Sequence, residues 1–294
     1  MNVLIPGLSG FCPGVKNAEN RIFDALNSDP TDSYTVLGMM INNRKYIEYL
    51  KEKNIETVDE LSSIKKGTTV VIRTHGIDRK LQSSLSDDFN LIDLTCRNVK
   101  RVQEIIKDHS ERGAMVFITG KKSHPEVIGL QSYGMNTLIL ENIEELDEFI
   151  FNPELGGRRF NPGDYSEIFV TSQTTGGRKL FESAIEKISR KWPDAVIESF
   201  DSICPVTEKK EVEALSLQSD ADISFVIGDP LSSNANKLFK RLKDSDSHTL
   251  FIQDVSELKD LNIDFSKVKT SLVVSSASTP QFVESEVIEY LRSR

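Results

Sequence analysis

The sequence has 294 residues, three cysteines and a formal net charge of −9, from 36 Lys and Arg against 45 Asp and Glu. Its 38% hydrophobic and 28% charged residues are typical of a globular protein and exclude a disordered or fibrous chain. The acidic balance argues against nucleic-acid binding, no apolar run approaches the roughly 20 residues of a membrane helix, and no signal peptide is recognisable. We therefore expect a cytoplasmic protein with neither nucleic acid nor membrane as a partner.

The predicted elements alternate between strands and helices along the chain. Strand-like runs are expected at 2–6, 35–39, 69–73, 90–93, 114–119, 168–171, 195–200, 223–227 and 271–275. Helical spacing is found at 16–26, 44–52, 99–107, 127–131, 179–191, 206–217, 237–242 and 280–294. Repeated strand–helix units predict an α/β fold with small, mostly parallel sheets covered by helices.

The expected domain organisation is three modules, at 1–95, 96–195 and 196–294. Residues 1–15 and the C-terminal helix are candidates for packing at the centre. The segment 152–165 is rich in Gly, Pro and Asn, so we expect a surface excursion or a lid there rather than a catalytic motif.

Each third of the chain holds one cysteine: Cys12, Cys96 and Cys204. None belongs to a C-x-x-C pair, and an odd number of thiols in a reducing compartment argues against a disulfide framework. Each follows a strand-like run and precedes a predicted helix. Ligands collect at the carboxyl ends of parallel strands, and a helix start favours a thiolate. The alternative is three unrelated buried cysteines.

Two histidines lie at polar turns that follow predicted strands, His75 and His124. Glu126 is two residues beyond His124, and an imidazole next to a carboxylate could form a proton relay. The alternative for Glu126 is a carboxylate that complements the dipole of a helix start. His109 and His248 lie in charged surroundings, and we expect both on the solvated surface.

Three further turns are rich in hydroxyl groups: Ser232-Ser233-Asn234, Thr174-Thr175, and Ser278 ahead of a final helix. Hydroxyl, amide and backbone N–H donors at helix starts suit a phosphate group. The alternative for each turn is simple helix capping, for which Ser and Asn are preferred.

Together these segments resemble the 4-hydroxy-3-methylbut-2-enyl diphosphate reductase family of the non-mevalonate isoprenoid pathway. The matching motifs are GFCPGV at 10–15, THG at 74–76, DLTC at 93–96, HPEV at 124–127, SQTT at 172–175, IC at 203–204, SSN at 232–234 and AST at 277–279. Their order runs through the whole chain, which makes the resemblance specific.

The resemblance implies a trefoil of three α/β modules around one central [4Fe–4S] cluster, with Cys12, Cys96 and Cys204 as ligands and one open iron. It also implies reductive dehydroxylation of 4-hydroxy-3-methylbut-2-enyl diphosphate to isopentenyl and dimethylallyl diphosphate. Glu126, Thr174 and His124 would be catalytic, and an external ferredoxin or flavodoxin would donate electrons. The residues expected to hold this small anionic allylic substrate are His75, His124, Thr174, Thr175, Ser232, Ser233, Asn234, Ser278 and Asn42.

Four positions depart from the family pattern. Asn42 stands where the family has histidine, Arg97 follows Cys96 where the family prefers proline, Asp229 precedes the SSN turn, and Ser276 replaces a glycine. Asparagine can donate a hydrogen bond but has no charge, so its bond to a phosphate is weaker. The alternative function is a paralog with the same cluster and fold that acts on a different allylic or less anionic substrate. A non-catalytic cluster-binding sensor, a zinc-bound or structural protein, and a cluster-dependent dehydratase such as quinolinate synthase are further alternatives.

Overall fold

The computed structural model describes all 294 residues. The chain forms two compact units, one made of Met1–Thr74 with Pro205–Arg294 and the other of His75–Cys204. No helix is long and apolar enough to cross a membrane. The expected division into modules at 1–95, 96–195 and 196–294 stays a prediction.

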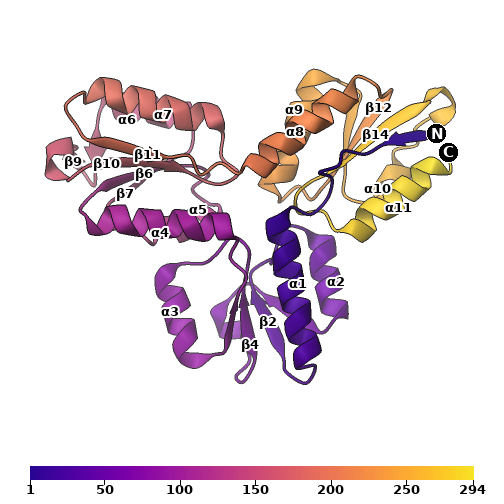
Figure 1. The fold of residues 1–294 in the computed structure, drawn as a ribbon, viewed down its shortest axis with the longest axis horizontal. Helices are drawn as coiled ribbons and strands as arrows, with labels where there is room; N and C mark the ends of the chain where they lie inside the picture. The colour runs from indigo at the N-terminus through magenta and orange to yellow at the C-terminus, as the bar shows by residue number, and fades with distance from the viewer. The chain divides into compact units, whose positions relative to one another are not determined.

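The first unit contains a parallel sheet with the strand order β1-β14-β12-β13. Its strands are β1 (Asn2–Leu4), β14 (Thr270–Ser275), β12 (Ile223–Ile227) and β13 (Thr249–Ile252). Figure 1 shows α8 (Pro205–Gln218) and α9 (Ser233–Ser245) on one face of this sheet, and α10 (Val255–Asp260) and α11 (Gln281–Arg292) on the other. Alternate residues of each central strand therefore enter opposite cores: Val226 packs with α8 and α9, and Phe225 packs with α10 and α11.

The same unit contains a second parallel group, in which β2 (Tyr34–Leu37) pairs with β3 (Ile55–Val58) on one side and β4 (Thr69–Ile72) on the other. The helices α1 (Pro13–Ser28) and α2 (Arg44–Glu52) and the short turn η1 (Leu61–Ser63) complete it. The helices bury apolar faces through Ile22, Tyr46 and Leu50.

The second unit is built on a parallel sheet with the order β11-β10-β6-β7. Its strands are β6 (Met115–Thr119), β7 (Thr137–Leu140), β10 (Ile168–Ser172) and β11 (Ile197–Phe200). Figure 1 shows α4 (Arg97–Glu111) and α5 (Pro125–Gln131) on one face, with α6 (Ile143–Phe151) and α7 (Arg178–Lys191) on the other. Two separate apolar cores fill the two faces. The unit also contains α3 (Arg79–Asp88) and β5 (Leu91–Asp93).

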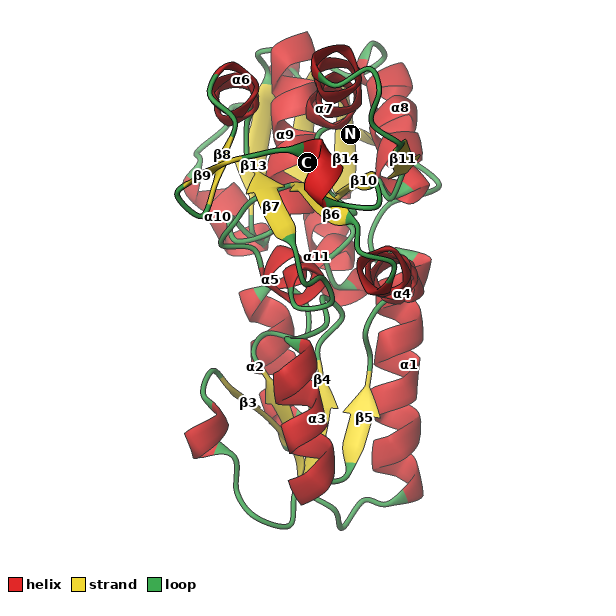
Figure 2. Ribbon diagram, turned by 90° about the vertical axis from the view of Figure 1, so that its left-hand side faces the viewer, coloured by secondary structure: helices red, strands yellow, loops and turns green.

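The Gly- and Pro-rich segment after α6 forms a small antiparallel hairpin of β8 (Glu154–Leu155) and β9 (Arg158–Arg159), visible beside α6 in Figure 2. Phe160 is buried next to this hairpin and contacts Phe117, Phe149 and Trp192. This aromatic anchor fixes the segment to the core of its own unit, which favours the surface excursion over a lid.

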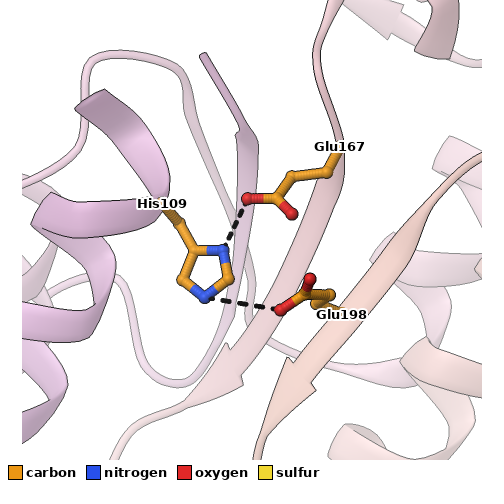
Figure 3. A group of neighbouring side chains, drawn as sticks. All are labelled: His109, Glu167 and Glu198. Carbon is orange, nitrogen blue, oxygen red and sulfur yellow. Dashed lines mark hydrogen bonds and ion pairs between the residues drawn. The ribbon is translucent and has the colours of Figure 1, made fainter. Parts of the chain in front are cut away.

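The structure corrects one expectation about the histidines. His109 is only 8% exposed and its ring stacks on Phe169 at a centroid distance of 3.8 Å. Figure 3 shows the ring between two carboxylates, with Nδ1 2.7 Å from Glu167 and Nε2 3.9 Å from Glu198. The prediction of a solvated His109 was wrong because the charged neighbours in the sequence lie on the outer face of α4, whereas His109 lies on the inner face. His248 is exposed, as predicted.

Candidate active site

In the second unit the predicted site residues follow the carboxyl ends of two neighbouring strands. His124 and Glu126 follow β6, and Thr174 and Thr175 follow β10. The two strands are parallel partners whose last residues, Thr119 and Ser172, are in register. The two polar turns are therefore adjacent, as expected for a site in an α/β protein.

Glu126 and Thr174 form a buried hydrogen-bonded pair. The Thr174 backbone N–H donates to Glu126 Oε1 at 2.6 Å, and the Thr174 hydroxyl donates to Oε2 at 2.9 Å. Glu126 is 1% exposed, and burial raises its pKa to about 7 against the two hydrogen bonds, which lower it. Near neutral pH this carboxyl group can therefore both hold and release a proton.

His124 is the N-cap residue of α5, and its Nδ1 accepts a hydrogen bond from the Glu126 backbone N–H at 3.2 Å. The acceptor role leaves Nε2 as the protonated nitrogen of the neutral ring. The His75 ring packs edge-on against His124, at a centroid distance of 5.4 Å. Thr175 accepts a hydrogen bond from the Gln173 side chain at 2.7 Å. The four predicted donors of this unit thus lie around the Glu126 turn: His75, His124, Thr174 and Thr175.

Two of the three cysteines also belong to the second unit. Cys96 is the N-cap residue of α4, and the Cys204 backbone N–H donates to the Thr174 carbonyl at 2.7 Å. The Cys204 sulfur accepts a hydrogen bond from Asn98 Nδ2 at 3.6 Å. Neither cysteine forms a disulfide, and both are partly exposed. Thr174 therefore contacts both the proposed acid, Glu126, and the backbone of a proposed ligand.

The first unit holds the third cysteine, Cys12, which is the N-cap residue of α1 and is also free and partly exposed. Its backbone N–H donates to the Ala277 carbonyl at 3.3 Å, at the turn after β14. A buried ammonium group lies nearby: Lys210 of α8 donates to the Gly10 carbonyl at 2.6 Å and to the Ser275 carbonyl at 3.1 Å. Sequence analysis missed Lys210. The pattern that could have indicated its burial is its helical spacing from Thr207, Ala214 and Gln218, which lie on the same buried face of α8.

The hydroxyl-rich turns of the first unit meet where β12 and β14 end. The Ser278 hydroxyl donates to the Ser232 hydroxyl at 2.9 Å, and Ser276 lies 3.3 Å from Ser278. Ser232 also caps α9 by accepting from Ala235 N–H at 3.3 Å, and Asn234 Oδ1 accepts from Thr207 at 3.2 Å. Capping and anion binding are therefore compatible here, because Ser233 and Asn234 remain partly exposed at the same helix start.

Asp229 does not present a free carboxylate to this turn. It is 3% exposed, and its Oδ1 accepts from Leu231 N–H at 2.8 Å while Oδ2 accepts from Arg44 N–H at 2.9 Å. Arg44 begins α2 two residues after Asn42, which is partly exposed. Asp229 therefore joins the Asn42 turn to the SSN turn. Arg97, in contrast, is exposed at the first position of α4.

The structure groups the predicted residues by unit. His75, Cys96, His124, Glu126, Thr174, Thr175 and Cys204 belong to the second unit, and Cys12, Asn42, Ser232, Ser233, Asn234 and Ser278 belong to the first. The convergence of the three cysteines on one cluster stays a prediction.

The chain matches the family model described as LytB protein over residues 3–292. A 4-hydroxy-3-methylbut-2-enyl diphosphate reductase of Caldanaerobacter subterraneus subsp. tengcongensis is 32% identical, over 100% of this chain and 97% of that protein. The enzyme of the same name from Clostridioides difficile is 29% identical over the full length of both chains.

Two solved structures are similar over nearly the whole chain. The structure of (E)-4-hydroxy-3-methyl-but-2-enyl diphosphate reductase, described as the terminal enzyme of the non-mevalonate pathway, has a TM-score of 0.72 and 25% identity over 100% of both chains. The Plasmodium falciparum E-1-hydroxy-2-methyl-but-2-enyl-4-diphosphate reductase has a TM-score of 0.84 and 22% identity, over 99% of this chain and 87% of that one. The predicted α/β fold with several small parallel sheets is confirmed, and the likeness fits the trefoil arrangement.

Proposed function

The chain belongs to the LytB protein family, and we propose that it is a working 4-hydroxy-3-methylbut-2-enyl diphosphate reductase that retains the family's substrate. The reaction replaces the allylic C–OH bond by C–H: two electrons and two protons enter, and the hydroxyl group leaves as water. The observation that supports this proposal most strongly is the buried Glu126–Thr174 pair, because it provides a proton source near neutral pH.

The family is iron–sulfur dependent, and the donor groups of this chain fit such a cofactor. Cys12, Cys96 and Cys204 form no disulfide and are partly exposed. Cys12 and Cys96 each lie at a helix N-terminus, and Cys204 accepts a hydrogen bond from Asn98 through sulfur. We assign these three as the ligands of one [4Fe–4S] cluster. Such a cluster supplies one-electron transfers and a Lewis-acidic iron.

The protein's own contribution to proton transfer is the second-unit network. Glu126 holds a proton on its carboxyl group, and the Thr174 hydroxyl lies within 2.9 Å of it. A hydroxyl both donates and accepts, so Thr174 can relay a proton from Glu126 to the substrate oxygen. The His124 Nδ1 contact with the Glu126 backbone fixes the turn that presents the carboxyl group.

We assign the diphosphate of the substrate to polar groups that each unit contributes. In the first unit Ser232, Ser278 and the start of α9 supply hydroxyl and backbone N–H donors. In the second unit His75, His124 and Thr175 add ring and hydroxyl donors. Asn42 would contribute a neutral hydrogen bond, so we expect weaker diphosphate binding than in relatives with a histidine there.

Anaerobic turnover with reduced methyl viologen and 4-hydroxy-3-methylbut-2-enyl diphosphate tests the proposal. We expect both isopentenyl and dimethylallyl diphosphate as products, a loss of about 10²- to 10⁴-fold in kcat for Glu126→Gln, and no loss for Glu141→Gln, which changes an exposed carboxylate at the end of β7. Reduced ferredoxin or flavodoxin should replace the dye. A protein with full iron content that does not turn this substrate over would refute the proposed function and favour the paralog with a different substrate.

A further inference from the structure

The loop that leads to Cys12 is held by side chains of two helices. Glu213 of α8 accepts hydrogen bonds from Gly7 N–H at 2.6 Å and from Leu8 N–H at 3.1 Å. The Ser9 hydroxyl donates to Glu284 of α11 and accepts from the Ser275 N–H at 2.9 Å. Three successive residues of the loop, Gly7 to Ser9, are thus fixed by groups outside it.

Lys210 continues this set of contacts one helical turn before Glu213. Its ammonium group joins the Gly10 carbonyl, two residues before Cys12, to the Ser275 carbonyl at the end of β14. The side chain is 4% exposed, and burial lowers its pKa to about 8, while the negative charges of Cys12, Glu284 and Glu213 raise it. At neutral pH Lys210 therefore remains mainly protonated, as a buried cation whose closest carbonyl partners flank the Cys12 loop.

Burying the charge of a lysine costs free energy unless the charge is paired and hydrogen-bonded. Two carbonyl groups satisfy two of the three donors of the ammonium, and carbonyls alone do not require a full positive charge. Three anionic groups, Cys12, Glu284 and Glu213, also act on the Lys210 ammonium. Among them only Cys12 is a proposed cluster ligand. Glu213 and Glu284 are already engaged by Gly7, Leu8 and Ser9. Of the three anionic groups that raise the pKa of Lys210, Cys12 has the largest effect, so the positive charge of Lys210 acts most strongly on the Cys12 sulfur.

We propose that Lys210 is a positioning residue of the reductase: it fixes the Gly10–Cys12 loop to the end of β14 and places a positive charge beside the Cys12 thiolate. This inference rests on the proposed function in one respect, namely that Cys12 ligates the cluster. A nearby positive charge stabilises the reduced, more negative form of a cluster. Lys210 thereby favours acceptance of the electrons that the reaction consumes.

The charge is tested in the reconstituted holoenzyme with Lys210→Met and Lys210→Gln, the second of which keeps an N–H donor without the charge. The matched control is Lys209→Met, which removes the same charge from an exposed neighbour on α8. We expect the midpoint potential of the cluster to shift to more negative values in both Lys210 variants and to stay at the wild-type value in the control. An unchanged potential in Lys210→Gln at wild-type iron content would overturn the electrostatic role.

The positioning role is tested without the cluster, by hydrogen exchange of the full-length apo protein. The Gly10 and Cys12 amides donate to Ser275 and Ala277 at 3.3 Å each, so they report on the loop. We expect exchange about tenfold faster in Lys210→Met, because a hydrogen bond to a charged group is lost, and wild-type exchange in Lys209→Met. Equal exchange in the two variants would overturn the positioning role. Because this readout needs no iron, a wild-type protein that takes up no cluster would refute the proposed function while the exchange data still decide whether Lys210 fixes the loop.

Discussion

Replacement of Glu126 by glutamine should change how the stability of the protein depends on pH. The carboxyl group is buried, and its pKa lies at about 7 instead of the ordinary 4.5. The folded state therefore binds more protons than the unfolded state between these values, and stability falls as pH rises through this window. Glutamine has a similar shape, can accept from the Thr174 N–H and can donate to the Thr174 hydroxyl, but it does not titrate.

The size of the effect follows from the difference between the two pKa values. A rise of about 2.5 pKa units corresponds to about 3.4 kcal/mol of destabilisation when the group is fully ionised. About 1.4 kcal/mol of this is already present at pH 5.5, because the unfolded carboxyl group is mostly ionised there. Between pH 5.5 and 8.5, the wild-type protein should therefore lose about 2 kcal/mol relative to Glu126→Gln.

Urea unfolding of both apo proteins at several pH values between 5.5 and 8.5, followed by circular dichroism, measures this difference. Any constant effect of the substitution on packing cancels, because only the change with pH is compared. Glu141→Gln is the matched control, since Glu141 is exposed, and its difference from wild type should not vary with pH. A wild-type minus Glu126→Gln difference that stays constant across this range would show that the carboxyl group is already ionised in the folded protein, and the acid role of Glu126 would lose its basis.

Three further outcomes are expected. Serine at Cys12, Cys96 or Cys204 should lower bound iron and the visible absorbance of reconstituted protein, and full iron content in any one of the three variants would remove that residue from the ligand set. Asn42→His should lower KM for the diphosphate substrate about fivefold at unchanged kcat, because a charge-assisted bond replaces a neutral one; steady-state kinetics at high and low salt measures this, and an unchanged KM would mean that Asn42 does not touch the diphosphate. His109→Ala should destabilise the protein by about 2–3 kcal/mol in urea unfolding, because it removes a buried ring and leaves Glu167 without one of its partners, and a loss below about 0.5 kcal/mol would contradict the buried placement.

Three of the strands that sequence analysis missed have the same place in their sheets, while the helices α3, α6 and α10 and the hairpin strands β8 and β9 were missed as well. Strands β3, β7 and β13 are all edge strands of four residues, and none was predicted. A run of four residues contains too few positions to show a period, so such a strand is hard to distinguish from a loop by its pattern. The central strands were predicted because their apolar runs are buried on both faces, as in β6 and β12.

The site residues were more predictable than these edge strands, because the carboxyl ends of parallel strands lie at one end of the sheet. Cysteine, histidine and hydroxyl residues directly after a strand could therefore be selected from position alone. Lys210 could not be selected in this way, since it lies in the middle of a helix among other charged residues. Its burial depends on where α8 packs, which is a tertiary property that local spacing only suggests.

The role of Asp229 shows how a charge that opposes an expected ligand can support the binding site instead. An acid before the SSN turn is unfavourable for a phosphate if its oxygens are free. In the structure both Asp229 oxygens accept hydrogen bonds from backbone N–H groups, Oδ1 from Leu231 and Oδ2 from Arg44. The Arg44 Nε also lies 3.6 Å from Asp229 Oδ2. Asp229→Asn would keep one acceptor oxygen and lose the other, so the contact to Leu231 or to Arg44 must break. We therefore expect Asp229→Asn to raise KM by loosening one of the two turns despite removing a negative charge, and a lowered KM would show that simple repulsion outweighs the support.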